Sequence, residues 1–169
     1  TNRNEPQNRL FTPPFAAIAT AQLFSLLGED ILKFVVPLYL LNLSGSATLY
    51  GIVVACAFLP YIFLTPIGGA LADRVNKKYV MAALDLVMAV SALAYVLFPK
   101  RDLVVLPIVI LMLLYAAQSV YQPTVQLSVP SVVAHNRIPS ATAIVTQVSA
   151  LTGLVGPVIG GLVFGFFGV

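Results

Sequence analysis

Long apolar runs separated by short polar segments dominate the chain. A helix that spans the hydrocarbon core of a bilayer needs roughly 20 mostly apolar residues, and each run reaches that length. The pattern therefore predicts five transmembrane helices, at about residues 15–41, 48–71, 78–98, 103–129 and 140–169. Polar turns separate them at residues 42–47, 72–77, 99–102 and 130–139, and residues 1–12 form a polar tail.

Composition agrees with a membrane protein and adds an orientation. Hydrophobic residues make up 59% of the chain and charged residues only 9%. The net charge of +3 comes mostly from loops, which indicates membrane orientation and not nucleic-acid binding. Cytoplasmic loops are rich in Lys and Arg. With the N-terminus inside, the cytoplasmic side holds Arg3, Arg9, Arg74, Lys77, Lys78 and Arg137, and the other side holds Lys100 and Arg101. We therefore expect a multi-pass protein of the cell membrane with a cytoplasmic N-terminus.

One polar turn is unusually dense in charge. Asp73, Arg74, Lys77 and Lys78 fall within six positions, and Gly69 precedes the acid by one helical turn. A small residue there lets a neighbouring helix approach closely, and the acid can then meet the positive N-terminal end of that helix. The alternative is an ordinary basic loop on the cytoplasmic side, which explains the bases but not their order.

The order of residues 69–81 resembles the loop between helices 2 and 3 of the major facilitator superfamily. Matching positions are Gly69, Leu71, Ala72, Asp73, Arg74 and Lys78, while Lys77 replaces an arginine and Met81 a leucine. Asn76 stands where the family usually has glycine, and Asn tolerates a left-handed backbone better than most residues. The resemblance implies that Gly69, Asp73, Arg74, Lys77 and Lys78 form a conformational-switch loop, in which Gly69 and Asp73 dock against a second half.

The resemblance also implies a fold. The family has twelve helices in two similar halves of six, so this chain is expected to be an all-α membrane protein. Residues 1–12 would be a cytoplasmic tail, and residues 13–169 would be helices 1–5, most of the N-terminal six-helix bundle, with the second half absent.

Charged residues inside the predicted helices are candidates for function, because burial in a bilayer is costly for them. Glu29, Asp30 and Lys33 lie in the first run, where one base faces two acids at i,i+4 and i,i+3. The acid that Lys33 leaves unpaired must find another partner or bind a proton. Asp85 is the other intramembrane acid. Glu29, Asp30 and Asp85 are therefore proton-coupling candidates, with a purely structural role as the alternative for each.

Three glutamines line up in the fourth run. Gln118, Gln122 and Gln126 recur at i, i+4 and i+8, so they form one polar stripe. Amides are costly against lipid, so the stripe must face protein or a water-filled cavity. Lining of a cavity is the favoured interpretation, and bonding between helices is the alternative.

The last run carries small residues at Gly153, Gly156, Pro157, Gly160 and Gly161, a face that lets helices pack closely. It resembles the G-P-x-x-G-G signature of drug:proton antiporters in the superfamily, which implies packing at the interface between the two halves. A generic packing face is the alternative. Residues 122–130 and 28–30 resemble the macrolide-efflux-like branch. Drug antiporters commonly carry an arginine within helix four, and its absence here argues against a proton relay through that helix.

These features together predict part of a secondary efflux transporter and not an enzyme. The resemblance implies export of amphipathic drugs or hydrophobic metabolites by proton antiport with alternating access. A transport-inactive membrane fragment, and an importer or uniporter of the same fold, remain as alternatives. Expected partners are the lipid bilayer, a small substrate, protons, and either a C-terminal half or further copies of the chain. The sequence has no metal-ligand cluster and no phosphate-binding glycine loop, so we expect no metal and no cofactor.

Overall fold

Five long α-helices make up the described part of the protein in the computed structural model. The structure describes residues 11–97 and 105–167, with the backbone alone for residues 71–74, 96 and 167. The helices are α1 (Pro13–Ser44), α2 (Ala47–Arg74), α3 (Lys77–Leu97), α4 (Val105–Val132) and α5 (Ile138–Phe167), and a short 3₁₀ helix, η2 (His135–Arg137), precedes α5. The described residues contain no strand. The predicted all-α class is confirmed.

Four of these helices, α2 to α5, are long and apolar enough to cross a membrane. The first helix, α1, has 32 residues, which corresponds to about 48 Å at 1.5 Å per residue and exceeds a hydrocarbon core of roughly 30 Å. Unlike the other four, α1 is not apolar enough along its length to be counted as a membrane-spanning helix. Glu29, Asp30 and Lys33 interrupt its apolar run. Its charges therefore need partners inside the protein.

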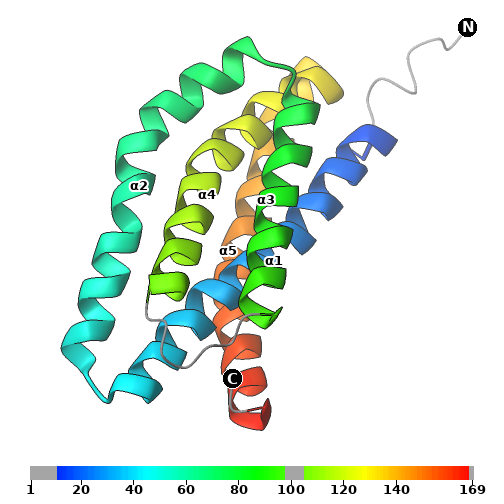
Figure 1. The fold of residues 1–169 in the computed structure, drawn as a ribbon. Helices are drawn as coiled ribbons and strands as arrows, with labels where there is room; N and C mark the ends of the chain where they lie inside the picture. The colour runs from blue at the N-terminus through cyan, green and yellow to red at the C-terminus, as the bar shows by residue number, and fades with distance from the viewer. Residues whose placement is uncertain (1–10, 98–104, 168–169) are drawn as a thin grey trace, which may run out of the picture.

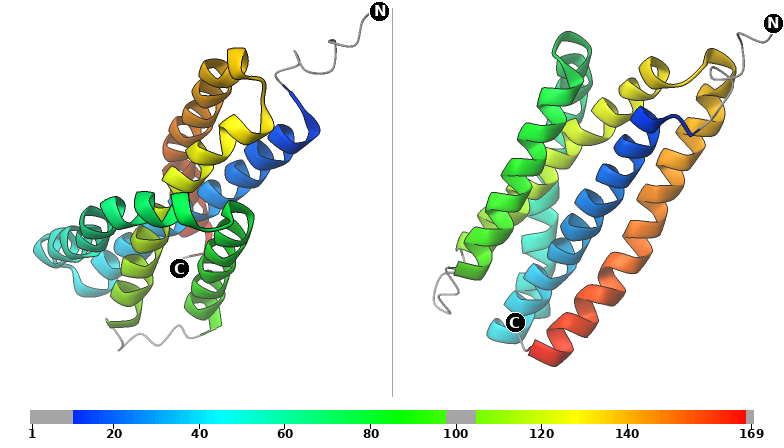
Figure 2. Two further views of the ribbon diagram at one scale, coloured as in Figure 1. Left: turned by 90° about the horizontal axis from the view of Figure 1, so that it is seen from above. Right: turned by 90° about the vertical axis from the view of Figure 1, so that its right-hand side faces the viewer.

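The helices form one bundle in which α4 is central (Figures 1 and 2). Helix α4 packs against α2, α3 and α1, and α1 packs along α5. The start of α1, the α2–α3 junction and the α4–α5 junction lie at one end of the bundle, and the α1–α2 junction lies at the other. In the membrane-spanning window of α4, 39% of the residues are buried, against 11% for α2. Helix α4 therefore supplies the middle of the core, including Leu111, Leu114, Tyr121 and Val125.

Two turns are shorter than the sequence pattern predicts. Residues 42–47 were expected to form the first turn, but only Gly45 and Ser46 separate α1 from α2. Gly45 ends α1 with a left-handed φ of 64° and donates its N–H to the Leu41 carbonyl, as helix-terminating glycines commonly do. One left-handed glycine is enough to end a helix, so the polar residues before it remain helical.

The expected loop at residues 130–139 is also mostly helical. Helix α4 continues past Pro130 to Val132, and the Val133 N–H still reaches the Val129 carbonyl at 3.3 Å. The Thr12 hydroxyl donates to the Val132 carbonyl at 2.9 Å and also accepts from the Phe15 N–H at 3.3 Å. Thr12 thus caps the start of α1 and satisfies a carbonyl at the end of α4, which holds these two helix ends together.

Asn76 does not adopt the left-handed backbone that its place in the motif suggested. Among the described residues, Gly45 is the one with a positive φ. The Asn76 side-chain oxygen instead accepts the Lys78 N–H at 3.2 Å, and its carbonyl accepts the Tyr79 N–H at 3.0 Å. Asn76 therefore acts as the N-terminal cap of α3, a position that favours asparagine.

Close packing between α2 and α4 depends on Gly68. A Cβ atom at Gly68 would lie 2.6 Å from the Ser119 carbonyl oxygen and 3.0 Å from the Val120 Cα, whereas a Cβ atom at Gly69 would meet nothing within 4 Å. The sequence had indicated Gly69 as the position that a neighbouring helix approaches. Within the described bundle that position is Gly68, and Gly69 faces open space.

We expect Gly68→Ala to lower the stability of the bundle by about 1–3 kcal/mol, because backbone atoms of α4 cannot move aside as a flexible side chain can. Gly69→Ala is the matched control: the same change one residue away meets no atom, and alanine is the better helix former. Thermal unfolding of both variants in detergent measures the difference. Equal melting temperatures would show that α2 and α4 are not packed at Gly68.

Candidate functional site

A buried ion pair lies within α1. Glu29 is 2% exposed, and its Oε1 atom lies 2.6 Å from the Lys33 Nζ atom one turn later. Apolar side chains surround the carboxylate, since Leu32, Met88 and Leu114 line the same groove. No hydrogen-bond donor among the described residues reaches the Glu29 Oε2 atom. Lys33 therefore provides the stabilising charge for this carboxylate.

Lys33 also links α1 to α4. Its ammonium group donates to the Gln118 Oε1 atom at 2.5 Å and lies 4.3 Å from the centroid of the Tyr115 ring. A cation held over an aromatic face is attracted by the ring electrons. The sequence indicated that Lys33 neutralises one acid, and the structure identifies that acid as Glu29 while adding two contacts on another helix.

Asp30 occupies a different environment from its neighbour. Its side chain is half-buried and lines a pocket of about 280 Å³ between α1, α4 and α5. The other residues that line this pocket are Lys33, Phe34, Tyr115, Gln118, Gly153 and Pro157. Thr152, on α5, is a neighbour of the Asp30 carboxylate, and its hydroxyl group donates to the Ser149 carbonyl at 3.0 Å. The two adjacent acids therefore face different sides of α1, with Glu29 buried beside the α1–α3 groove and Asp30 facing a pocket between α1, α4 and α5.

Asp85 lies on α3 and lines the same groove as Glu29. Its Oδ1 atom accepts a hydrogen bond of 2.6 Å from the Ser25 hydroxyl group of α1. This contact joins Asp85 to α1, and its role as a proton-coupling or structural acid stays a prediction. Asp85 thus connects α1 and α3 at the edge of a groove, and it does not line the pocket that contains Asp30.

The glutamine stripe divides into three different environments. Gln118 lines the Asp30 pocket and accepts from Lys33. Gln122 is half-buried and its amide donates to the Ser149 hydroxyl group of α5 at 3.4 Å. Gln126 is exposed. The sequence analysis treated lining of a cavity and hydrogen bonding between helices as alternatives. Both occur within this one stripe, at Gln118 and Gln122 respectively.

The glycines of α5 pack within this bundle. A Cβ atom at Gly156 would lie 2.6 Å from the Asp30 Cβ atom, and one at Gly160 would lie 3.1 Å from a Val35 methyl carbon. Within this bundle α1 covers these two residues, and the expected packing of the face at the interface between two halves stays a prediction. Gly153 is exposed and a Cβ atom there would meet nothing within 4 Å.

Sequence reasoning missed a polar contact between α1 and α5. Gln22 is fully buried, and its amide donates to the Ser149 hydroxyl group at 3.1 Å, which also receives the Gln122 amide. The signal was present in the sequence, since Gln22 lies two turns before Glu29 on the same face of an otherwise apolar helix. One hydroxyl group therefore joins α1, α4 and α5 on this side of the core.

The charged loop is described only in part. The side chains of Asp73 and Arg74 lie outside the described residues. Gly69 faces open space, Lys77 is half-buried and Lys78 is exposed. Both lysines line a second pocket, of about 800 Å³, between α1, α3 and α4. The proposed docking partner of this loop is not among the described residues, so its switch role stays a prediction.

Comparison with known proteins places this bundle in a family. The family model of the Major Facilitator Superfamily matches residues 18–169. The chain belongs to the major facilitator superfamily. Members of this family are transporters, so a non-enzymatic, membrane-embedded protein is the supported class. No solved structure matches the chain.

Two curated relatives of this major facilitator chain carry the same description. Macrolide efflux protein A from Streptococcus pyogenes, and the protein of that name from Streptococcus pyogenes serotype M6, are each 25% identical to it over 152 residues. The matched region is 89% of this chain and 38% of each relative. The chain thus spans well under half the length of the relatives that it matches.

Proposed function

We propose that the chain is the first part of a transporter that exports amphipathic drugs or hydrophobic metabolites in exchange for protons. Two helical bundles that rock around a central site would provide alternating access. Family membership and the efflux activity in the relatives' name support this direction of transport. The observation that carries the proposal is the Asp30 carboxyl group, which faces a pocket between α1, α4 and α5.

Asp30 is the acid best placed to bind and release a proton. Lys33 neutralises Glu29 inside the core, and Asp85 is held by Ser25 on the other side of α1. Asp30 faces a pocket and keeps a charge that Lys33 does not fully balance, because two acids share one base. Ionisable groups within membrane helices commonly mark proton and substrate pathways.

The pocket around Asp30 is the proposed first-half wall of the substrate site. Its volume of about 280 Å³ is below the roughly 300–1,000 Å³ of sites that enclose drug-sized ligands. A second bundle facing α4 and α5 would close and enlarge it. Tyr115, Phe34 and Pro157 supply apolar and aromatic surface, and Gln118 supplies a polar group, which suits an amphipathic compound.

The charged loop is proposed to control the rocking motion. Gly69 leaves space beside α2, so a helix of the second half can approach there, with the Asp73 carboxylate near its N-terminal end. Lys77, Lys78 and Arg74 would hold the loop at the membrane surface. In this proposal the chain is oriented with its N-terminus in the cytoplasm, where these bases belong.

Transport by the complete protein in liposomes tests the proposal. With an imposed pH gradient, acidic inside, we expect uphill accumulation of a labelled macrolide in vesicles in which the protein's cytoplasmic side faces outward, and loss of that accumulation when the gradient is collapsed. The 169-residue chain alone should give no flux, since one partial bundle cannot alternate access.

Four outcomes would contradict the proposal, and each favours an alternative. Flux that ignores the pH gradient indicates a uniporter, and flux in the opposite direction indicates an importer. No flux from the complete protein with any amphipathic substrate favours a membrane protein without transport activity. Flux from the 169-residue chain alone would replace the two-bundle scheme with a homo-oligomeric transporter.

A further inference from the structure

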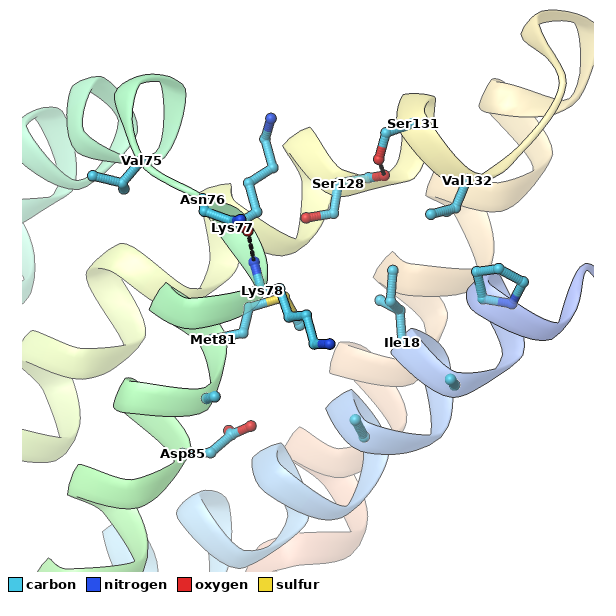
Figure 3. A pocket seen from close by; sticks show the side chains of 14 residues that line it. Ile18, Val75, Asn76, Lys77, Lys78, Met81, Asp85, Ser128, Ser131 and Val132 are labelled. Atoms are coloured by element: carbon cyan, nitrogen blue, oxygen red, sulfur yellow. Dashed lines mark hydrogen bonds between the residues drawn. The ribbon is translucent and has the colours of Figure 1, made fainter.

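The pocket beside the charged loop has the features of a lipid site. It is the cavity of about 800 Å³ between α1, α3 and α4, and it lies at the end of the bundle where the α2–α3 and α4–α5 junctions meet. Helix ends of a spanning bundle lie at the level of the lipid head groups. Figure 3 shows Lys78 reaching across the opening toward Ile18 of α1, with Asp85 deeper in the pocket.

The charge at the mouth of this pocket is positive. Residues 73–78 contain Asp73, Arg74, Lys77 and Lys78, a net charge of +2. Neither lysine forms an ion pair with a described side chain. Asp85, the acid that lines the deeper part of the pocket, already accepts from Ser25. An anionic group would therefore be held by Lys78 at the mouth, with Lys77 adding positive charge at the rim, and kept away from the carboxylate below.

The two serines of the pocket are acceptors toward a ligand, while the side-chain amide nitrogen of Asn76 adds a donor at the mouth. The Ser128 hydroxyl group donates to the Thr124 carbonyl and the Ser131 hydroxyl group donates to the Ser128 carbonyl, each at 2.7 Å. Their protons are committed to the backbone, so both oxygens offer lone pairs to a ligand. A ligand that suits the site carries an anionic phosphate for the lysines and hydroxyl groups for these serines.

Apolar surface continues from the polar mouth toward the middle of the membrane. Ile18, Met81 and Val132 line the pocket. A second groove of about 500 Å³ shares Ala21 and Asp85 with it and runs on between α1 and α3 past Phe24, Leu32 and Met88. Its lining is mostly apolar, and Glu29, which is paired with Lys33, also contributes to it. Phe24 is 73% exposed along this groove. The path accepts a hydrocarbon chain attached to the head group at the mouth.

We propose that this pocket binds an anionic phospholipid with a hydroxyl-bearing head group, of the phosphatidylglycerol type, from the leaflet at the α2–α3 end of the bundle. The phosphate lies against Lys78, which reaches across the opening, while Lys77 adds positive charge at the rim (Figure 3). The head-group hydroxyls meet Ser128 and Ser131, and an acyl chain follows the α1–α3 groove. Basic pockets between membrane helices are known to hold such head groups. The site is distinct from the Asp30 pocket, and its occupation does not depend on which substrate is transported.

Native mass spectrometry of the complete transporter, titrated with phosphatidylglycerol or with phosphatidylcholine of the same acyl chains, tests this site. Each lysine near a membrane surface contributes to anionic lipid binding, so Lys77→Gln with Lys78→Gln should weaken phosphatidylglycerol binding roughly 30-fold. Lys100→Gln with Arg101→Gln removes the same charge between α3 and α4 and is the matched control. Lys77→Arg with Lys78→Arg should retain binding.

Several results would overturn the proposal. Equal binding of the two lipids would mean that the lysines do not select an anionic head group. Equal weakening by both double variants would mean a general effect of net charge. Displacement of the lipid by millimolar inorganic phosphate would mean a site for a soluble anion. Absence of bound phosphatidylglycerol in the unmodified transporter would mean that another segment of the protein fills the pocket. None of these measurements involves transport, so their outcome is independent of the proposed efflux function.

Discussion

Lys33→Met is expected to destabilise the bundle by about 3 kcal/mol, the lower end of the cost of breaking a buried ion pair. The variant leaves the Glu29 carboxylate 2% exposed among apolar side chains and without its cation. It also removes the contacts of Lys33 with Gln118 and Tyr115, which join α1 to α4. Thermal unfolding in detergent at neutral pH measures the loss.

The double variant Glu29→Met with Lys33→Met is the control for this prediction. Methionine has a similar length and fills irregular apolar space, and replacing a whole buried ion pair by apolar residues is often neutral. We expect the double variant to recover most of the stability lost in Lys33→Met. If the single and double variants melt together, the cost lies in the α1–α4 contacts of Lys33 and not in an unpaired Glu29 charge.

The sequence predicted the fold better than it predicted the turns. Five apolar runs of spanning length leave little freedom in helix number, because each must satisfy its own backbone in lipid. Turn boundaries depend on single hydrogen bonds. Thr12 satisfies a carbonyl at the end of α4, which is 120 residues away in sequence, and Asn76 caps α3 through its side chain. The periodicity of the sequence predicts neither of these two contacts.

The candidate residues were found from the sequence, but their partners were not. Polar residues in apolar runs are easy to recognise, so Glu29, Asp30, Asp85 and the glutamines were all identified. Which acid Lys33 pairs with depends on side-chain geometry, since both i,i+3 and i,i+4 neighbours are within reach on a helix. The Ser25 contact to Asp85 depends on how α1 and α3 pack, which local spacing does not specify.

The glycines illustrate the same limit. The sequence marked Gly69 and the α5 run as small faces for close packing, and it assigned them to contacts with a second half. In the structure the close approaches are at Gly68 against α4 and at Gly156 against α1, while Gly69 and Gly153 meet nothing. A one-residue shift turns a helix position by about 100°, so a motif identifies a small-residue segment but not the face that packs.

Asp30→Asn in the complete transporter is expected to reduce substrate accumulation driven by a pH gradient to the level of protein-free liposomes. Asparagine keeps the size of the side chain and one acceptor oxygen, but it cannot exchange a proton. Downhill exchange of labelled for unlabelled substrate, which needs no net proton movement, should continue. The measurement is the ratio of gradient-driven accumulation to this exchange.

Asp85→Asn is the control, because Asp85 lies outside the Asp30 pocket and is held by Ser25. If Asp85→Asn loses coupling while Asp30→Asn keeps it, the proton site lies in the groove between α1 and α3. If the Glu29 and Lys33 double methionine variant folds but loses coupling, Glu29 takes part in proton exchange and is not merely the partner of Lys33.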